Sequence, residues 1–144
     1  MATVGDILRI KGTDVLSVGP EATVLDAAQR MNEHAAGSVL VIEGGELLGI
    51  FTERDVLRRV VAARRDPAVT PVREVMTTKL VTCEPATDTE SCAQVMSDGH
   101  IRHMPVLAGG RLTGLVTSGD LLAYQLRDQA STIQQLQGFI FDGR

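Results

Sequence analysis

Two threonine–aspartate pairs are the residues of this sequence best suited to binding chemistry, namely Thr52 with Asp55 and Thr117 with Asp120. In each pair an apolar run ends at the Thr and the Asp follows three residues later, which is the spacing of a helix N-cap and an acidic N3 residue. Such a pair can be purely structural. It can also bind, because a carboxylate held at a strand end accepts hydrogen bonds from both hydroxyls of a diol. The free N–H groups of the first helical turn, with a hydroxyl such as that of Ser118, also suit a phosphate.

These pairs belong to an internal repeat. A shift of 65 residues aligns 12 identical residues over the 38 positions from Pro20 to Leu57 without a gap, where chance would give about two or three at ordinary residue frequencies. Gly44-Gly45 then meets Gly109-Gly110, and each pair lies between two apolar runs. Paired glycines in that place predict tight hairpin turns, because both residues can adopt positive φ.

Each copy predicts a helical lead-in, a strand, an amphipathic helix, a β-hairpin and a final helix. In the first copy Thr3 is expected to cap a lead-in helix over 4–8, and apolar residues recur at helical spacing at Val24, Ala27, Ala28 and Met31. The expected strands of this copy are 14–18, 38–42 and 47–51.

The second copy repeats this order. Thr70-Pro71 is expected to cap a lead-in helix over 72–76, and Cys92, Ala93 and Met96 take the inward helix positions. Its expected strands are 79–83, 103–107 and 112–116. The fold class is therefore α/β (α+β), with repeats over 1–65 and 66–127, each a small three-stranded sheet with two packed helices. Units this small bury little surface alone, so we expect them to pack sheet against sheet as one compact module.

Composition excludes several classes of function. Apolar residues make up 44% of the 144 residues and charged residues 22%, with a net charge of −4, so the chain lacks the positive field of a nucleic-acid-binding protein. No stretch of about 18 apolar residues predicts a membrane span. Cys83, Cys92 and the His100-x-x-His103 pair have no metal-ligand spacing, so we expect no metal site. A cytoplasmic protein is the simplest interpretation.

The sequence resembles the CBS (cystathionine-β-synthase) domain family in four stretches. Leu48–Leu57 and Thr113–Leu122 are similar to the closing signature of a CBS repeat, Ile101–Val106 to the strand before the hairpin, and Val75-Met76-Thr77 to the lead-in. The resemblance covers about residues 4 to 126. It implies a pseudo-two-fold pair, or Bateman module, with two clefts that bind AMP, ADP, ATP, NAD or S-adenosylmethionine. It further implies a non-enzymatic sensor that is a homodimer and acts on a partner such as a regulated enzyme or transporter.

The resemblance also implies roles for particular residues. It assigns the ribose to Asp55 and Asp120, and the phosphates to Arg102 with His103 as a supporting donor, although charged residues at a strand start are commonly just solvated. The first copy has Gly37-Ser38 in that place, and the second has Gly119 where the first has Arg54, so the two sites are expected to differ. The sequence leaves open which site Arg102 serves. Candidates for holding the base are Val15, Lys79, Leu80 and Met104, although residues in such places are more often plain core. Pro105 is a further candidate residue of the site.

Two alternatives to a nucleotide sensor remain from the sequence. One is an interaction module whose dimer surface is the function and whose clefts are empty, and the other is a sensor of S-adenosylmethionine. An enzyme is disfavoured because no recognisable carboxylate pair, Ser/His/Asp set or P-loop is present. The tail 128–144 predicts an amphipathic helix through Ile133, Leu136 and Ile140, which either covers its own domain or packs across a dimer.

Overall fold

The computed structural model describes residues 1–142, and side chains for all of these except residues 131, 132 and 138–142. The chain divides into two compact units. The first-repeat unit comprises residues 14–81, and the second-repeat unit comprises residues 1–13 together with the chain from residue 82 onward. The lead-in of each sequence repeat therefore folds with the other repeat. The boundaries 1–65 and 66–127 describe the duplication in the sequence, which is a different division from these units.

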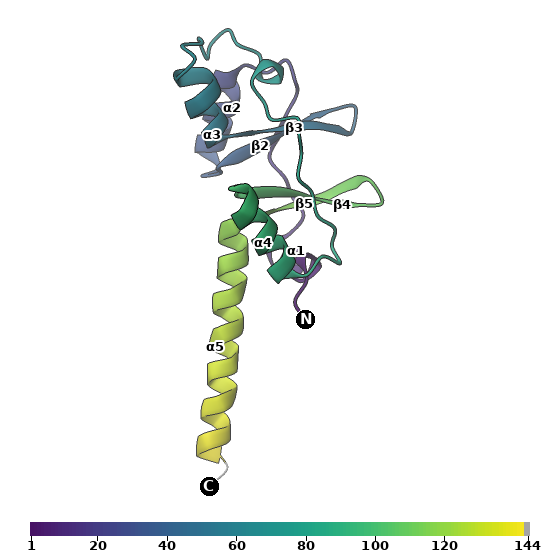
Figure 1. Ribbon diagram of the computed structural model, residues 1–144, viewed down its shortest axis with the longest axis vertical. Coiled ribbons are helices and arrows are strands. Elements are labelled where there is room, and N and C mark those ends of the chain that lie inside the picture. The colour runs from purple at the N-terminus through teal and green to yellow at the C-terminus, as the bar shows by residue number, and fades with distance from the viewer. Residues whose placement is uncertain (143–144) are drawn as a thin grey trace. The chain divides into compact units, whose positions relative to one another are not determined.

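The first-repeat unit is a three-stranded sheet with helices packed on it (Figure 1). The strand order is β1-β2-β3, with β1 parallel to β2 and β2 antiparallel to β3. The positive φ values of Gly44 (59°) and Gly45 (80°) confirm the predicted hairpin turn. The elements are β1 (Ser17–Val18), α2 (Val24–Glu33), β2 (Ser38–Glu43), β3 (Glu46–Thr52), α3 (Glu53–Asp55), a π-helical continuation (Val56–Val61) and a 3₁₀ turn (Val72–Glu74).

The second-repeat unit contains a two-stranded sheet and three helices. Its elements are α1 (Val4–Lys11), α4 (Thr89–Gly99), β4 (His103–Ala108), β5 (Arg111–Thr117) and α5 (Ser118–Asp142). Thr3 caps α1 as predicted. Cys92 and Met96 are buried on α4 as expected from the helical spacing, but Ala93 is exposed, so its predicted place in the core is wrong.

The strand predicted over 79–83 is absent, and only Cys83 forms a bridge, parallel to Val106. The reason lies in Pro105. In the first-repeat unit the matching residue is Leu40, whose N–H donates to the carbonyl of Leu16 at 2.9 Å and holds β1 on the sheet. Proline has no N–H to donate, so the corresponding ladder bond cannot form and the segment before Cys83 lies off the sheet.

The exchange of lead-ins depends on two glycines that the repeat conserves between its copies. A Cβ at Gly49 would lie 2.8 Å from the carbonyl oxygen of Thr77, and a Cβ at Gly114 would lie 2.9 Å from a methyl group of Leu8. Each glycine thus lets one lead-in cross its strand closely. In the first-repeat unit the crossing is closed by a pair of backbone hydrogen bonds between Ile50 and Thr77, at 2.9 and 2.8 Å.

The second lead-in differs from its prediction. Val72–Glu74 is a single 3₁₀ turn with Pro71 at the N-cap and no side-chain cap, so the expected Thr70 cap is wrong. The Thr70 hydroxyl instead donates to the carbonyl of Asp66 at 2.7 Å. Thr70 is buried at 4% exposure, and this local bond satisfies its hydroxyl at the end of the preceding turn.

Helix α5 is one continuous helix from Ser118 to Asp142, rather than a short helix followed by a separate tail (Figure 1). Leu121 and Tyr124 pack against the core of the second-repeat unit. Further along, Leu126, Ile133 and Leu136 are 56%, 55% and 57% exposed, while the side chain of Ile140 lies outside the described residues. Among the described residues no helix is both long and apolar enough to cross a membrane.

Candidate functional site

Both threonine–aspartate pairs form reciprocal capping boxes, which confirms their structural interpretation. The Thr52 N–H donates to Oδ2 of Asp55 at 3.0 Å, and the Asp55 N–H donates back to the Thr52 hydroxyl at 3.3 Å. The Thr117 N–H donates to Oδ2 of Asp120 at 2.9 Å, with the return bond at 3.1 Å. These bonds fix each carboxylate at a strand-to-helix junction, but they engage only part of its hydrogen-bonding capacity.

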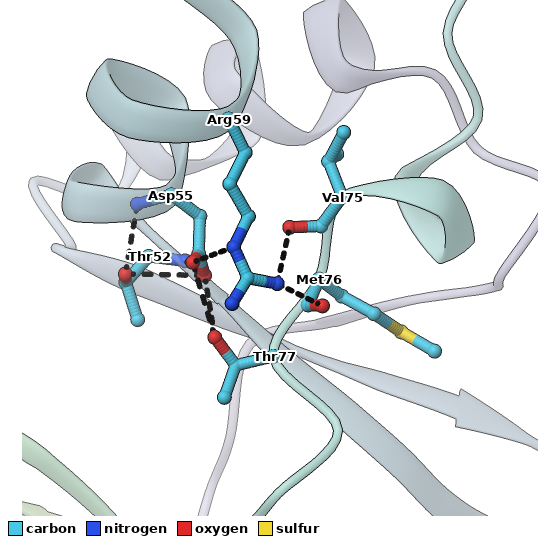
Figure 2. Close-up of polar contacts among 6 residues, drawn as sticks. All are labelled: Thr52, Asp55, Arg59, Val75, Met76 and Thr77. Atoms are coloured by element: carbon cyan, nitrogen blue, oxygen red, sulfur yellow. Dashed lines mark hydrogen bonds and ion pairs between the residues drawn. The ribbon is translucent and has the colours of Figure 1, made fainter. Parts of the chain in front are cut away.

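The remaining capacity of Asp55 is filled by its own chain (Figure 2). The hydroxyl of Thr77 donates to Oδ1 at 3.0 Å, and Nε of Arg59 forms an ion pair with the same oxygen at 3.6 Å. Arg59 is held in turn by the carbonyl of Met76, 2.8 Å from its Nη1. Asp55 is only 5% exposed. This carboxylate is therefore a buried and bonded group, and a diol would have to displace Thr77 to reach Oδ1.

Asp120 has a different environment. Its side chain is 24% exposed and forms an ion pair with Nζ of Lys11 at 2.6 Å. The same ammonium group donates to the carbonyl of Leu115 at 2.9 Å. The pair borders a cavity of about 120 Å³ between α1 and α5, which is lined by Ile7, Ile10, Lys11, Asp120, Ala123, Tyr124 and Arg127.

Strand pairing brings several predicted site residues to these carboxylates. Ser38 pairs with Thr52 in one hairpin and His103 with Thr117 in the other. The carbonyl of Gly37 accepts a hydrogen bond from the Glu53 N–H at 3.1 Å.

The carbonyl of Arg102 accepts a hydrogen bond from the Ser118 N–H at 3.0 Å, at the matching position of the second repeat. Arg102 and His103 lie at the junction that carries Asp120, in the second-repeat unit. Their proposed phosphate contacts stay predictions.

The candidates for holding a base are spread over both units. Met104 is 1% exposed, with its sulfur 3.6 Å from Cys92 Sγ, and lies in the hydrophobic core, as one of the two interpretations allowed. Pro105 is buried next to it. In the first-repeat unit Val15 and Leu80 are half-buried and Lys79 is exposed, and Arg54 is exposed on the first turn of α3. Their binding roles stay predictions.

Sequence reasoning missed three residues that meet the carboxylates, namely Lys11, Arg59 and Thr77. Arg59 stands in a charge run that is typical of a solvated helix face, and its spacing of four from Asp55 was the available signal. Lys11 and Thr77 lie in the lead-ins, and only the exchange of the lead-ins brings them to the Asp residues. No group of three or more His, Cys, Asp or Glu residues in the described part of the chain could hold a metal ion.

Comparisons with known proteins agree with this architecture. The family model described as "CBS domain" matches residues 3–62 and 72–127. The CBS domain-containing protein YhcV of Bacillus subtilis is 38% identical over 119 residues, covering 83% of this chain and 84% of the relative. A solved structure of a protein with CBS domains from Burkholderia ambifaria has a TM-score of 0.85 at 39% identity, covering 89% of this chain and 96% of that one.

A more distant structure is a CBS domain pair solved in complex with 5′-methylthioadenosine and S-adenosylmethionine. It is 24% identical with a TM-score of 0.75, and the match covers 85% of this chain and 98% of that one. At that identity the likeness concerns the fold. The family model matches the chain twice, in agreement with the duplicated signature and with the hairpin and helix found in each unit. The chain therefore belongs to the CBS domain family as a tandem pair of regulatory CBS repeats.

Proposed function

We propose that this chain is a regulatory module without catalytic activity that binds an adenine nucleotide (AMP, ADP, ATP or NAD) with the ribose at Asp120. The observation that carries this proposal is the half-open carboxylate of Asp120 beside a cavity of about 120 Å³. A carboxylate in that state can accept hydrogen bonds from a ribose diol. The adenosyl ligands of the related pair support the same ligand class.

In this proposal the two repeats differ in how readily their Asp carboxylates can bind a ligand. Asp55 is buried and bonded by Thr77, so binding there requires the lead-in to move, whereas Asp120 requires only that Lys11 turn away. A ligand can change the protein only as far as it favours one arrangement over another. We therefore assign ligand capture to the second-repeat unit. Binding shifts the protein toward the conformation that the ligand binds more tightly, and this conformation acts on a partner enzyme or transporter.

Calorimetric titration of the full chain with AMP, ATP, NAD, 5′-methylthioadenosine and S-adenosylmethionine tests the proposal. Asp120→Ala should weaken binding by about 10-fold to 100-fold, since hydrogen bonds to a charged group are worth about 1.5–3 kcal/mol. Asp128→Ala removes the same charge from the same helix and should leave affinity unchanged. If the wild-type protein binds none of these compounds below about 1 mM, which is about −4 kcal/mol, the proposal is refuted. Tighter binding of S-adenosylmethionine than of any nucleotide would instead favour the sensor of that ligand.

A second candidate function is an interaction module, and helix α5 favours it. Leu122, Leu126, Ile133 and Leu136 are 57%, 56%, 55% and 57% exposed. With Gln129 they recur at alternating steps of four and three, which is the spacing of a coiled-coil seam. No residue from 129 to 141 is charged, so two copies of this helix would meet without like-charge repulsion. We propose that α5 pairs with α5 of a second chain in a homodimer.

Sedimentation velocity over a concentration series measures this association. Ile133→Lys places a charge in the seam and should shift the protein toward monomer, because a buried unpaired charge is costly. Gln135→Lys adds the same charge two residues away and off the seam, and should leave the distribution unchanged. A monomeric wild type, or equal effects of both changes, would count against pairing through α5.

A further inference from the structure

In the second-repeat unit Lys11 makes the two contacts that Thr77 makes in the first-repeat unit, one to a strand carbonyl and one to the Asp carboxylate. In the first-repeat unit the carbonyl of Ile50 accepts the N–H of Thr77 at 2.8 Å, and the Thr77 hydroxyl donates to Asp55 at 3.0 Å. The 65-residue shift carries Ile50 to Leu115 and Asp55 to Asp120.

At those two matched positions the donor is a single group. Nζ of Lys11 donates to the carbonyl of Leu115 at 2.9 Å and to Oδ2 of Asp120 at 2.6 Å. The partner of the first carboxylate is thus a neutral hydroxyl on a short side chain, close to the backbone. The partner of the second carboxylate is a cation at the end of a long, flexible side chain.

This replacement changes what happens when a ligand arrives. Lys11 and the Thr117 N–H both donate to Oδ2 of Asp120, so a diol that bonds to both carboxylate oxygens competes with Lys11 for Oδ2. The Lys11 side chain is only 32% exposed, so an ammonium group that loses its partner there pays for incomplete hydration. A ligand that carries its own negative charge within reach of Lys11 removes that cost.

The cavity beside Lys11 supplies a second cation. Arg127 lines it about two turns along α5 from Asp120, and Tyr124 lies between them on the same helix. The charged residues of the lining are Lys11, Arg127 and Asp120, which sum to one positive charge. The rest of the lining is mainly apolar, through Ile7, Ile10 and Ala123, so the charges are weakly screened there compared with open solvent.

We infer that Lys11 and Arg127 form an anion subsite that holds the phosphate of a nucleotide whose ribose is bound by Asp120. This inference rests on the proposed function and adds to it the residues that hold the phosphate. The second-repeat site selects phosphorylated adenosines over neutral adenosine and 5′-methylthioadenosine, and over S-adenosylmethionine with its sulfonium cation. This selectivity arises because Lys11 loses the carboxylate of Asp120 as its partner when the ribose binds, and a phosphate can take the place of that carboxylate.

The test compares AMP with adenosine on the full chain by calorimetry. In Lys11→Met the affinity for AMP should fall about 10-fold to 100-fold, the equivalent of one charge-assisted hydrogen bond. The affinity for adenosine should stay the same or rise, because the variant removes the ammonium that competes for Asp120. Lys11→Arg should recover most of the AMP affinity. Arg9→Met, on the same helix but paired with Asp6, is the matched control and should change neither affinity.

Two results would overturn the inference while leaving the proposed function in place. One is an equal loss of AMP and adenosine affinity in Lys11→Met, which would mean that Lys11 only supports the fold. The other is unchanged AMP affinity in both Lys11→Met and Arg127→Met. Absence of binding by the wild-type protein of every adenosine compound is a distinct outcome, and it would refute the proposed function together with this inference.

Discussion

Thr77 and Asp55 stand 22 residues apart and are joined by a hydrogen bond of 3.0 Å from the Thr77 hydroxyl to Oδ1 of the carboxylate. This bond satisfies a carboxylate that is only 5% exposed. It also links the lead-in of the second sequence repeat to the last helix of the first. The first-repeat unit is therefore closed by polar contacts as well as by its apolar core.

The Thr77→Val substitution tests this closure. Valine keeps the shape of threonine but donates no hydrogen bond, so a buried carboxylate loses one of its partners. We expect the free energy of unfolding to fall by about 1–3 kcal/mol. Urea denaturation of the full chain measures the change. Thr78→Val, at the exposed neighbouring position, should cost less than about 0.5 kcal/mol, and equal losses in the two variants would rule out the closure as the cause.

Alanine substitutions at Gly49 and Gly114, where the lead-ins cross the strands, should destabilise the protein to different extents. In Gly49→Ala the new methyl group would lie 2.8 Å from a backbone oxygen of Thr77, which cannot move without shifting the lead-in. We expect a loss of about 1–3 kcal/mol in unfolding free energy from overpacking.

Gly114→Ala provides the comparison at the matching position. There the contact at 2.9 Å is with the end of the Leu8 side chain, which can rotate away. The loss of stability should therefore be smaller than in Gly49→Ala, as measured by the same urea titration. A larger loss in Gly114→Ala would mean that the close approach is not what these glycines provide.

Much of the local structure was predictable, because caps and turns depend on neighbouring residues. The Thr52/Asp55 box and the Gly44-Gly45 turn are contained within a few positions of the sequence. The missing strand before Cys83 could also have been predicted from Pro105, which stands where the first repeat has Leu40. A duplicated sequence indicates where ladder bonds should recur, and proline shows where one cannot.

The partners of the carboxylates could not be predicted in the same way. Thr77 reaches Asp55 and Lys11 reaches Asp120 only because each lead-in packs with the other repeat. That exchange depends on contacts between residues far apart in the chain. The shift of 65 also fails to align Lys11 with Thr77, since a side-chain ammonium in one unit performs the tasks of a backbone N–H and a hydroxyl in the other.

Helix α4 carries a pH-dependent cap at Asp88. The pKa of this carboxyl lies below its usual value because the Ser91 N–H, at 2.7 Å, and the Ser91 hydroxyl, at 2.8 Å, donate to the ionised form. A carboxyl with a lowered pKa in the folded state adds stability above its unfolded pKa, near 3.9. That stability is lost as the pH falls through the lower, folded pKa.

Asp88→Asn separates the charge from the cap. Asparagine is about as good an N-cap residue as aspartate, so the variant should keep α4 while losing this titration. Thermal unfolding from pH 6 to pH 2 should show a shallower decline of Tm in the variant than in the wild type. Parallel curves would show that Asp88 does not contribute to acid unfolding. Asp6→Asn is a useful comparison, because its pKa is also lowered, first by the Thr3 backbone N–H and then by Arg9.

The cysteines provide a probe of the second-repeat core. Hydrogen bonding with Cys92 and burial raise the pKa of the Cys83 thiol well above its ordinary range, and both thiols are free and buried. Because the thiolate is the reactive form, Cys83 should react with a thiol reagent at pH 8 far more slowly than an exposed cysteine. Labelling should become complete in denaturing urea.

Met104→Ala, which removes the contact of Met104 with Cys92 Sγ at 3.6 Å, should open the core and speed native-state labelling. Exposed Val81, changed to Ala as a control, should leave the rate unaltered. Fast labelling of the wild-type protein would show that this core opens readily and that burial does not protect the pair.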